Sequence, residues 1–320
     1  HDNDALLFAQ ELAKKHSAPL IVNYVIWNYT WEGATRRFYD WVLPSLLEVE
    51  EELRKHGIPL VITFEEVHLF KKKHFEKIPP HIGAVVIDQL PLHFMNVWKE
   101  QFLTHHKDTP LYEVDAHNCV PVWELSPKQE FAARTIRSKI HTKLPDFLED
   151  YTSLSNHHEN ESILKTITLI DWADVRSRII CREDVSGVGE YIPSQREGYK
   201  KLAVFLDEKL PSYDVDRNNF NTQGQSNLSP YIAHGNISRR KIILELIKKN
   251  MLEIQDAFDT IKNGSNGTMG SVAAFIEEAV VRAELCENFC FYNPHYDRYE
   301  GFPAWAKETL KKASTDTREY

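Results

Sequence analysis

The sequence lacks any long apolar run, and none approaches the ~20 residues that a helix needs to cross a bilayer. Cysteine is scarce, with four residues at irregular spacing in a chain of 320. Such usage indicates reduced thiols in an intracellular protein, with a disulfide framework as the alternative. Positive charge is not in excess either, because the formal net charge is −9. This charge argues against a protein that binds nucleic acid by bulk charge alone, although it leaves room for a local basic patch.

Several common site motifs are also missing. The chain contains no GxxxxGK[ST] or GxGxxG phosphate loop and no GxSxG nucleophile elbow. Its histidines do not form an HxxxH pair with an acidic partner, and Cys286 and Cys290 lie one helical turn apart without a second ligand pair. A structural zinc site needs about four such ligands. The sequence therefore predicts no metal site.

The first 125 residues alternate between two hydrophobic periods. Short segments rich in Val and Ile are typical of buried strands, and they cover residues 19–27, 57–64, 84–90 and 110–116. Segments with leucines at helical spacing lie before and between them, at residues 3–16, 34–56 and 91–105. This order predicts an α/β domain, residues 1–125, with a doubly wound parallel sheet. Because the first helix has no strand before it, we also expect a missing upstream strand.

The remainder of the chain has a different pattern. Residues 126–195 contain polar and Gly/Pro-containing stretches without a clear period, so an irregular connector is expected there. Residues 196–320 read as a succession of helices. Two domains also agree with the length of the chain, since about 150 residues per domain is usual. We therefore expect an α/β domain followed by an all-helical domain.

The stretch GQSNLSPYIAHGNIS, residues 224–238, places three good helix-capping residues just before an apolar segment: Ser226, Asn227 and Ser229. Pro230 suits the first turn of a helix, so a helix is predicted to begin between Leu228 and Pro230. The capping side chains would satisfy its free N–H groups. Alternatively, those N–H groups and the hydroxyls would hold an anion, because the helix dipole favours negative charge. The stretch by itself is compatible with both interpretations.

A second candidate site lies in FIEEAVVRAELCENF, residues 275–289. Helical spacing places five residues on one face: Phe275, Glu278, Arg282, Leu285 and Phe289. Glu278 and Arg282 have the i,i+4 spacing of an ion pair. A charged pair within an apolar stripe needs further partners, so it is either a buried structural salt bridge or a polar pair facing a ligand.

These blocks resemble the class II DNA photolyases. The segment VDAHNCVPVWELSPKQEFAARTIRSKI, residues 114–140, is similar to the region that follows the α/β domain in that class. GQSNLSPYIAHGNIS resembles its FAD-phosphate segment, and FIEEAVVRAELCENFCFYNPHYD, residues 275–297, resembles its signature helix. The resemblance extends over nearly the whole chain and implies a helical FAD-binding domain after the α/β domain.

The resemblance also implies an activity. Class II photolyases are lyases that repair cyclobutane pyrimidine dimers in ultraviolet-damaged DNA, using light and an electron from reduced FAD. The cofactor carries the chemistry and the protein positions it, while the damaged bases are flipped into a pocket. The antenna chromophore is not identified by the resemblance, and nothing in the sequence requires more than a monomer.

Individual residues acquire roles from the resemblance alone. Tyr213 matches a tyrosine near the flavin phosphates, and the loop Ser226, Asn227, Leu228 and Ser229 matches the phosphate-binding loop. On the signature helix, Glu278 matches the catalytic glutamate that contacts the base edges of the dimer. Arg282 matches the first arginine of the signature and is expected to bind the cofactor, and Asn288 matches its asparagine, which is expected at the DNA-facing site.

Three departures from the family pattern bear on function. Ala283 replaces the second arginine of the signature, and Ala233 replaces an aromatic residue or histidine of the phosphate segment. The chain is expected to be truncated at both ends relative to the family, which leaves open whether these residues bind FAD or act alone. The alternatives are therefore a flavin photoreceptor of the cryptochrome type, without repair activity, and an inactive relic.

Overall fold

The first part of the chain alternates helices with strands. The structure, a computed structural model, describes residues 2–28, 35–66, 81–250, 253, 258–259 and 267–317. Its first elements are α1 (Asp4–Lys15), β1 (Val22–Asn28), α2 (Arg36–Lys55), β2 (Leu60–Glu66), β3 (Val85–Asp88), α4 (His93–His105) and β4 (Leu111–Val114). Each lies within two or three residues of the segment predicted from hydrophobic periodicity.

The strands pair in parallel, as predicted. β1 pairs with β2 from Val22 opposite Leu60, and β3 pairs with β4 from Val85 opposite Leu111. Helix α2 connects the first pair and α4 the second, which is the crossover that parallel strands require. Within the described residues, the strands form two separate two-stranded ladders rather than one continuous sheet.

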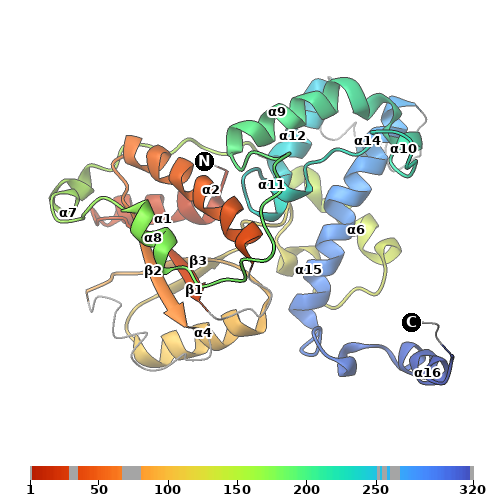
Figure 1. The fold of residues 1–320 in the computed structure, drawn as a ribbon, viewed down its shortest axis with the longest axis horizontal. Coiled ribbons are helices and arrows are strands. Elements are labelled where there is room, and N and C mark those ends of the chain that lie inside the picture. Colours follow the sequence, from red (N-terminus) through yellow and green to blue (C-terminus); the bar gives the residue numbers. More distant parts are fainter. Residues whose placement is uncertain are drawn as a thin grey trace.

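A later helix, α8 (Trp172–Arg178), completes the packing of this α/β domain. Ile26 of β1 is buried together with Tyr39 of α2, Val175 of α8 and Ile179. In Figure 1, α2 and α8 lie on one side of the strands and α4 on the other. The α/β domain is thus covered on both faces, as parallel sheets usually are, and one of its covering helices comes from beyond residue 125.

Residues 126–195 are not the irregular connector that was expected. They contain α6 (Ala133–Phe147), α7 (Glu161–Leu164) and α8. Ile136, Ile140 and Leu144 of α6 are fully buried in the core of the helical domain. These residues recur at four-residue intervals, so the periodicity was present in the sequence but was obscured by the charged residues between them.

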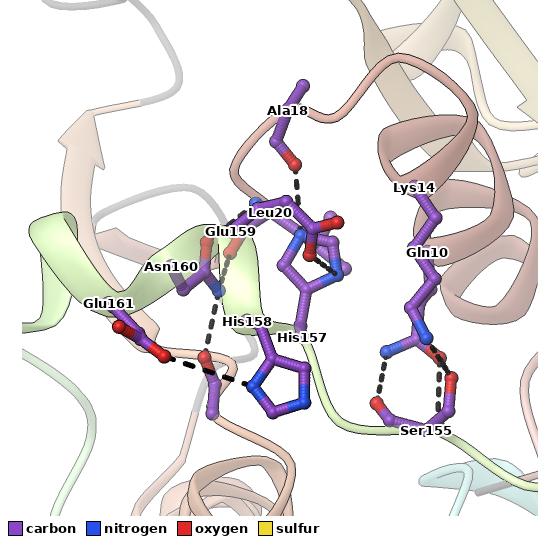
Figure 2. Close-up of polar contacts among 11 residues, drawn as sticks. Gln10, Lys14, Ala18, Leu20, Ser155, His157, His158, Glu159, Asn160 and Glu161 are labelled. Carbon is purple, nitrogen blue, oxygen red and sulfur yellow. Dashed lines mark hydrogen bonds and ion pairs between the residues drawn. The ribbon is translucent and has the colours of Figure 1, made fainter.

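Between α6 and α7, the chain is attached to the α/β domain by hydrogen bonds between side chains and backbone groups (Figure 2). The side chain of Gln10 donates to the Ser155 carbonyl at 2.6 Å and accepts from the Ser155 N–H at 3.0 Å. The buried amide of Asn160 accepts from Leu20 N at 2.9 Å and donates to the carbonyls of Leu20 and Gly57, both at 2.8 Å. This part of the chain is therefore fixed to the α/β domain rather than free between domains.

The helical domain continues from α9 to the end of the described chain. Its helices are α9 (Gln195–Val204), α10 (Tyr213–Asp216), α11 (Ser229–Ala233), α12 (Arg239–Lys249), α14 (Thr268–Ile276), α15 (Ala283–Tyr292) and α16 (Ala304–Ala313). A π-helical segment, Glu277–Arg282, joins α14 to α15 and is called the π turn below. None of the described helices is both long enough and apolar enough to cross a membrane.

Helix α2 of the α/β domain also supports the helical domain at α11. The indole of Trp41 donates to Asn236 Oδ1 at 2.8 Å, and Asn236 Nδ2 donates to Ser45 Oγ at 2.9 Å. The Trp41 ring also stacks on His234 at 5.1 Å between centroids. Because Asn236 and His234 directly follow α11, this contact fixes the segment GQSNLSPYIAHGNIS against the α/β domain.

Candidate functional site

A cleft of about 400 Å³ opens in the helical domain between α10, α11, α14 and the π turn. Its volume lies in the range of about 300–1,000 Å³ that is usual for ligand sites. The residues that line it are Tyr213, Arg217, Asn218, Gln225, Ser226, Ser229, Ile232, Ala233, Arg239, Phe275, Glu278, Ala279 and Ala283. Both alanines that depart from the family pattern, Ala233 and Ala283, are among them.

Four of the residues predicted from the sequence line this cleft: Tyr213, Ser226, Ser229 and Glu278. The first three approach the fourth from segments far away in the sequence. The structure does not bring the other four predicted residues into the lining, namely Asn227, Leu228, Arg282 and Asn288. The two stretches singled out in the sequence therefore do meet, and only part of each faces the cleft.

The loop before α11 is shaped by two backbone features. Asn227 has a positive φ of 58°, a left-handed conformation that Asn tolerates better than most residues. Gly224 approaches Asp216 so closely that an added Cβ would lie 2.6 Å from the Asp216 Cβ. Together they turn the chain so that Leu228 is buried in the core while Ser226 and Ser229 stay at the cleft.

The helix predicted to begin between Leu228 and Pro230 does begin there, at Ser229, but it is short. α11 contains only five residues, and Gly235, with a φ of 71°, separates it from α12. No side chain caps its N-terminus; the nearest contact is a 3.4 Å hydrogen bond from Leu228 N to Ser226 Oγ. Capping by the three polar residues is therefore wrong. Because a single turn has only a small dipole, anion binding here would depend on hydroxyls and cations.

The predicted ion pair between Glu278 and Arg282 is also wrong. Glu278 pairs with Arg217 of the loop after α10, with 2.7 Å between Oε1 and Nη1. Arg282 instead pairs with Glu277 at 3.2 Å. The physical reason is the π turn, whose i→i+5 hydrogen bonds align residue 282 with 277 rather than with 278. Glu278 is exposed at the cleft and Phe275, which is buried, lines the same cleft, whereas Arg282 of the predicted face does not line it.

Two cationic side chains of the cleft were missed as site residues. Arg217 lies one helical turn after Tyr213, and this i,i+4 spacing is the sequence signal that could have identified it. Its Nε–H is buried and has no hydrogen-bond partner among the described residues. Arg239, at the start of α12, donates from Nη1 to the His117 carbonyl at 3.2 Å. Glu278 pairs with only part of the Arg217 guanidinium. The cleft therefore keeps hydrogen-bond donors that are available to an anion.

Tyr213 contributes an aromatic wall. Its ring meets Phe205 edge-on at 5.4 Å and Phe275 edge-on at 5.6 Å between centroids. Burial raises the pKa of its hydroxyl, so the phenol stays neutral at ordinary pH. This packing fixes the ring orientation, because edge-to-face pairs are geometrically specific.

Asn288 lies at the other end of the same helical run, away from the cleft lining. Its side chain is fully buried, and it accepts from Glu130 N at 2.6 Å and donates to the Lys128 carbonyl at 3.1 Å. Both polar groups of the amide therefore already have partners. These contacts attach the segment before α6 to α15.

Glu284, also on α15, was not singled out in the sequence. Its Oε1 accepts from Cys119 N at 2.8 Å and from Val120 N at 3.2 Å, while its Oε2 is buried without a hydrogen-bond partner among the described residues. Desolvation by burial raises the pKa of this carboxyl to about 8 despite the two N–H donors. Below that pH the group is protonated, and it connects α15 to the turn that leaves the α/β domain.

The described residues contain no cluster of three or more His, Cys, Asp or Glu side chains that could hold a metal ion. The donor set of the cleft, with hydroxyls and guanidinium groups around one carboxylate, instead suits an anionic organic ligand.

Comparison with known proteins places this arrangement in a family. The family model described as DNA photolyase matches residues 1–156. The chain is 37% identical over 322 residues to the deoxyribodipyrimidine photo-lyase of Potorous tridactylus, an alignment that covers 99% of this chain and 56% of that protein. It is 31% identical to the deoxyribodipyrimidine photo-lyase of Arabidopsis thaliana, covering 100% of this chain and 62% of that protein.

A solved structure agrees at the level of the fold. The archaeal photolyase from Sulfolobus tokodaii, a structure with two FAD molecules, has a TM-score of 0.55 and 16% sequence identity, and the match covers 92% of this chain and 60% of that one. The chain thus spans about 56–62% of the length of these proteins. With the α/β domain, the helical domain and relatives along its whole length, the chain belongs to the DNA photolyase family.

Proposed function

We propose that this protein is a light-dependent deoxyribodipyrimidine photolyase of the class II type, which opens cyclobutane pyrimidine dimers in ultraviolet-damaged DNA. The observation that carries the proposal is the cleft itself. It brings the hydroxyls of Ser226 and Ser229 and the carboxyl of Glu278 into one site. The names of the relatives, which are deoxyribodipyrimidine photo-lyases, support the same activity.

The residues of the cleft fit the phosphate portion of FAD. Ser226 and Ser229 offer hydroxyl donors, Arg217 offers a buried Nε–H without a partner, and Arg239 adds a second guanidinium. Charge-assisted bonds from guanidinium groups to phosphate oxygens are among the strong hydrogen bonds in proteins. When bound, reduced FAD would supply the light-driven electron transfer, while Tyr213 would contribute a fixed apolar wall beside it.

Glu278 would recognise the damaged bases. Its carboxyl is accessible and stands in the same cleft as the proposed phosphate donors. A carboxyl accepts from, or when protonated donates to, the polar edge of a base that has left the stack. Fixed hydrogen bonds of this type also stabilise negative charge that develops on the substrate. Arg217 would hold Glu278 in place until the substrate arrives, through the 2.7 Å ion pair.

The direct test measures FAD binding and dimer repair, in the dark and under blue light, for the native protein and for Glu278→Gln. We expect bound flavin in both proteins and light-dependent repair that falls about tenfold or more in the variant, the usual scale for losing one transition-state contact. Glu208→Gln, an exposed residue outside the cleft, is the matched control. Full repair by Glu278→Gln would contradict the assigned role, and repair in darkness would contradict the proposed activity.

The alternatives give different results in the same experiment. A flavoprotein that is photoreduced but repairs no dimers would be a photoreceptor of the cryptochrome type. A folded protein that remains colourless with added FAD would be an inactive relic. A double variant Ser226→Ala/Ser229→Ala separates cofactor binding from substrate binding, because it is expected to weaken flavin binding about tenfold while leaving Glu278 intact.

A further inference from the structure

Glu277 and Glu278 are neighbours in the sequence, but their side chains point to different partners. Glu278 faces the cleft and pairs with Arg217. Glu277 turns to α6, where Arg137 Nε donates to Oε2 and Arg137 Nη2 donates to Oε1, both at 2.8 Å. This two-pronged geometry is the strongest form of an arginine–carboxylate pair, and it fixes orientation as well as distance.

The pair is held more firmly than a surface salt bridge. The side chain of Glu277 is only 18% exposed, and a second guanidinium, Arg282, lies 3.2 Å from its Oε1. The hydrogen bonds from Arg137 hold the pKa of the Glu277 carboxyl below its usual value. The backbone that carries Arg137 is held in place, because its neighbours Ile136 and Ile140 on α6 are fully buried. We call Arg137, Glu277 and Arg282 the clamp.

The clamp spans the π turn from its first residue to its last. A π-helical segment is rare in proteins because it accommodates one extra residue per turn at a cost in stability. Reverting it to α-helix would rotate the residues before it by about 100° relative to α15, since that is the angle per residue in an α-helix. Such a rotation would carry Glu278 away from Arg217 and out of the cleft.

We propose that Arg137 is a positioning residue for the cleft: through its two-pronged bond to Glu277 it keeps the π turn formed and so holds Glu278 at the substrate. This inference rests on the proposed function, in which Glu278 contacts the damaged base. Arg137 does not line the cleft, so its effect on the substrate passes through Glu278.

The test measures binding in the dark, where no chemistry takes place. The dissociation constants for an oligonucleotide containing one thymine dimer and for the same oligonucleotide without it give a discrimination ratio. We expect Arg137→Met to lower this ratio about five- to tenfold, close to the effect of Glu278→Gln, as when one specific base contact is lost. Arg134→Met, which removes an exposed arginine one turn earlier on α6, should leave the ratio unchanged.

Two further variants separate positioning from general destabilisation. The double variant Arg137→Met/Glu278→Gln should discriminate no worse than Glu278→Gln, because Arg137 acts only through the carboxyl that is already lost. Arg137→Lys keeps the positive charge but not the two-pronged hydrogen bonding. Its discrimination ratio should lie between those of Arg137→Met and the native protein. If Arg137→Met does not fold, Arg137→Lys and its combination with Glu278→Gln provide the same comparison.

The outcomes also separate this inference from the proposed function. If the native protein binds both oligonucleotides equally, the proposed function fails. If the native protein discriminates and Glu278→Gln does not, but Arg137→Met matches the native ratio, the positioning role is overturned and the proposed function stands. Additive losses in the double variant likewise overturn it, because they would show that Arg137 acts independently of Glu278.

Discussion

Glu278 and Glu284 lie on one continuous helical run, and their surroundings are opposite. Glu278 is 46% exposed at the cleft and pairs with an arginine, while Glu284 is 1% exposed and meets only backbone N–H groups at its hydrogen-bonded oxygen. The first therefore remains available to a ligand. The second is occupied in holding the turn Cys119–Val120 against α15. The comparison indicates that α14, the π turn and α15 have a functional end and a structural end.

The largest expected effect on this comparison is the pH dependence of the free energy of unfolding, which depends on Glu284. Burial moves the pKa of Glu284 from 4.5 to about 8. The unfolded chain therefore loses this proton near pH 4.5, whereas the folded chain keeps it until about pH 8. The stabilising effect is complete below pH 4.5 and is lost as the pH rises to 8, a change of up to about 5 kcal/mol. We expect urea unfolding to show this decline between pH 5 and 8.5.

Glu284→Gln should remove the part of the decline that Glu284 causes, because an amide does not ionise. Its unfolding free energy should fall less than that of the native protein over the same range, where the raised pKa of Glu287 still contributes, and should exceed that of the native protein above pH 8. Glu208→Gln controls for the loss of one carboxyl elsewhere. Parallel pH profiles for the native protein and Glu284→Gln would show that Glu284 is ionised in the fold.

The next effect in size concerns Asn288, which belongs to the structural end. Asn288→Ala removes the partner of Glu130 N, which is buried, and of the Lys128 carbonyl, which is part-buried. Leaving one buried N–H unpaired costs about 1–3 kcal/mol, which urea unfolding at pH 7 measures. The matched control is Asn218→Ala at the exposed edge of the cleft. A loss in the free energy of unfolding below about 0.5 kcal/mol for Asn288→Ala would contradict a structural role for this residue.

The smallest effect is expected for the stability of Glu278→Gln. Its ion pair with Arg217 is partly solvated, with the two side chains 26% and 46% exposed, and such pairs contribute about 0–1 kcal/mol. The free energy of unfolding should therefore change by less than about 0.5 kcal/mol, and less still in high salt. A loss of 2 kcal/mol or more would make Glu278 a structural residue, and the two ends of the run would no longer differ.

The α/β domain shows how much of the fold was predictable. Its strands and helices follow from local periodicity, since strands such as β1 are short and rich in Val, Ile and aromatic residues and α2 repeats leucines at helical spacing. The connector was mispredicted because α6 buries a narrow stripe among charged residues. The boundary at residue 125 likewise did not anticipate that α8 packs back onto β1. Local patterns do not encode these long-range contacts.

The sequence was less informative about the site. It identified the two segments that meet at the cleft, because both resemble sequence blocks of the photolyase family. The predicted partner of Glu278 was wrong, because the prediction assumed the 100° per residue of an α-helix. The π turn instead aligns Arg282 with Glu277. The prediction also missed Arg217 and Arg239, whose shared position depends on a loop and a helix brought together by folding.

The sequence by itself determined the order of elements in the α/β domain and the chemistry available, because apolar periodicity and residue type are local properties. It indicated the family through the resemblance of its motifs. The tertiary structure decided which glutamate faces the cleft, which arginine meets it, and which acid is buried enough to stay protonated at neutral pH. These outcomes depend on one extra residue in a helical turn and on the removal of water from a carboxyl, and both are set by packing between segments distant in the chain.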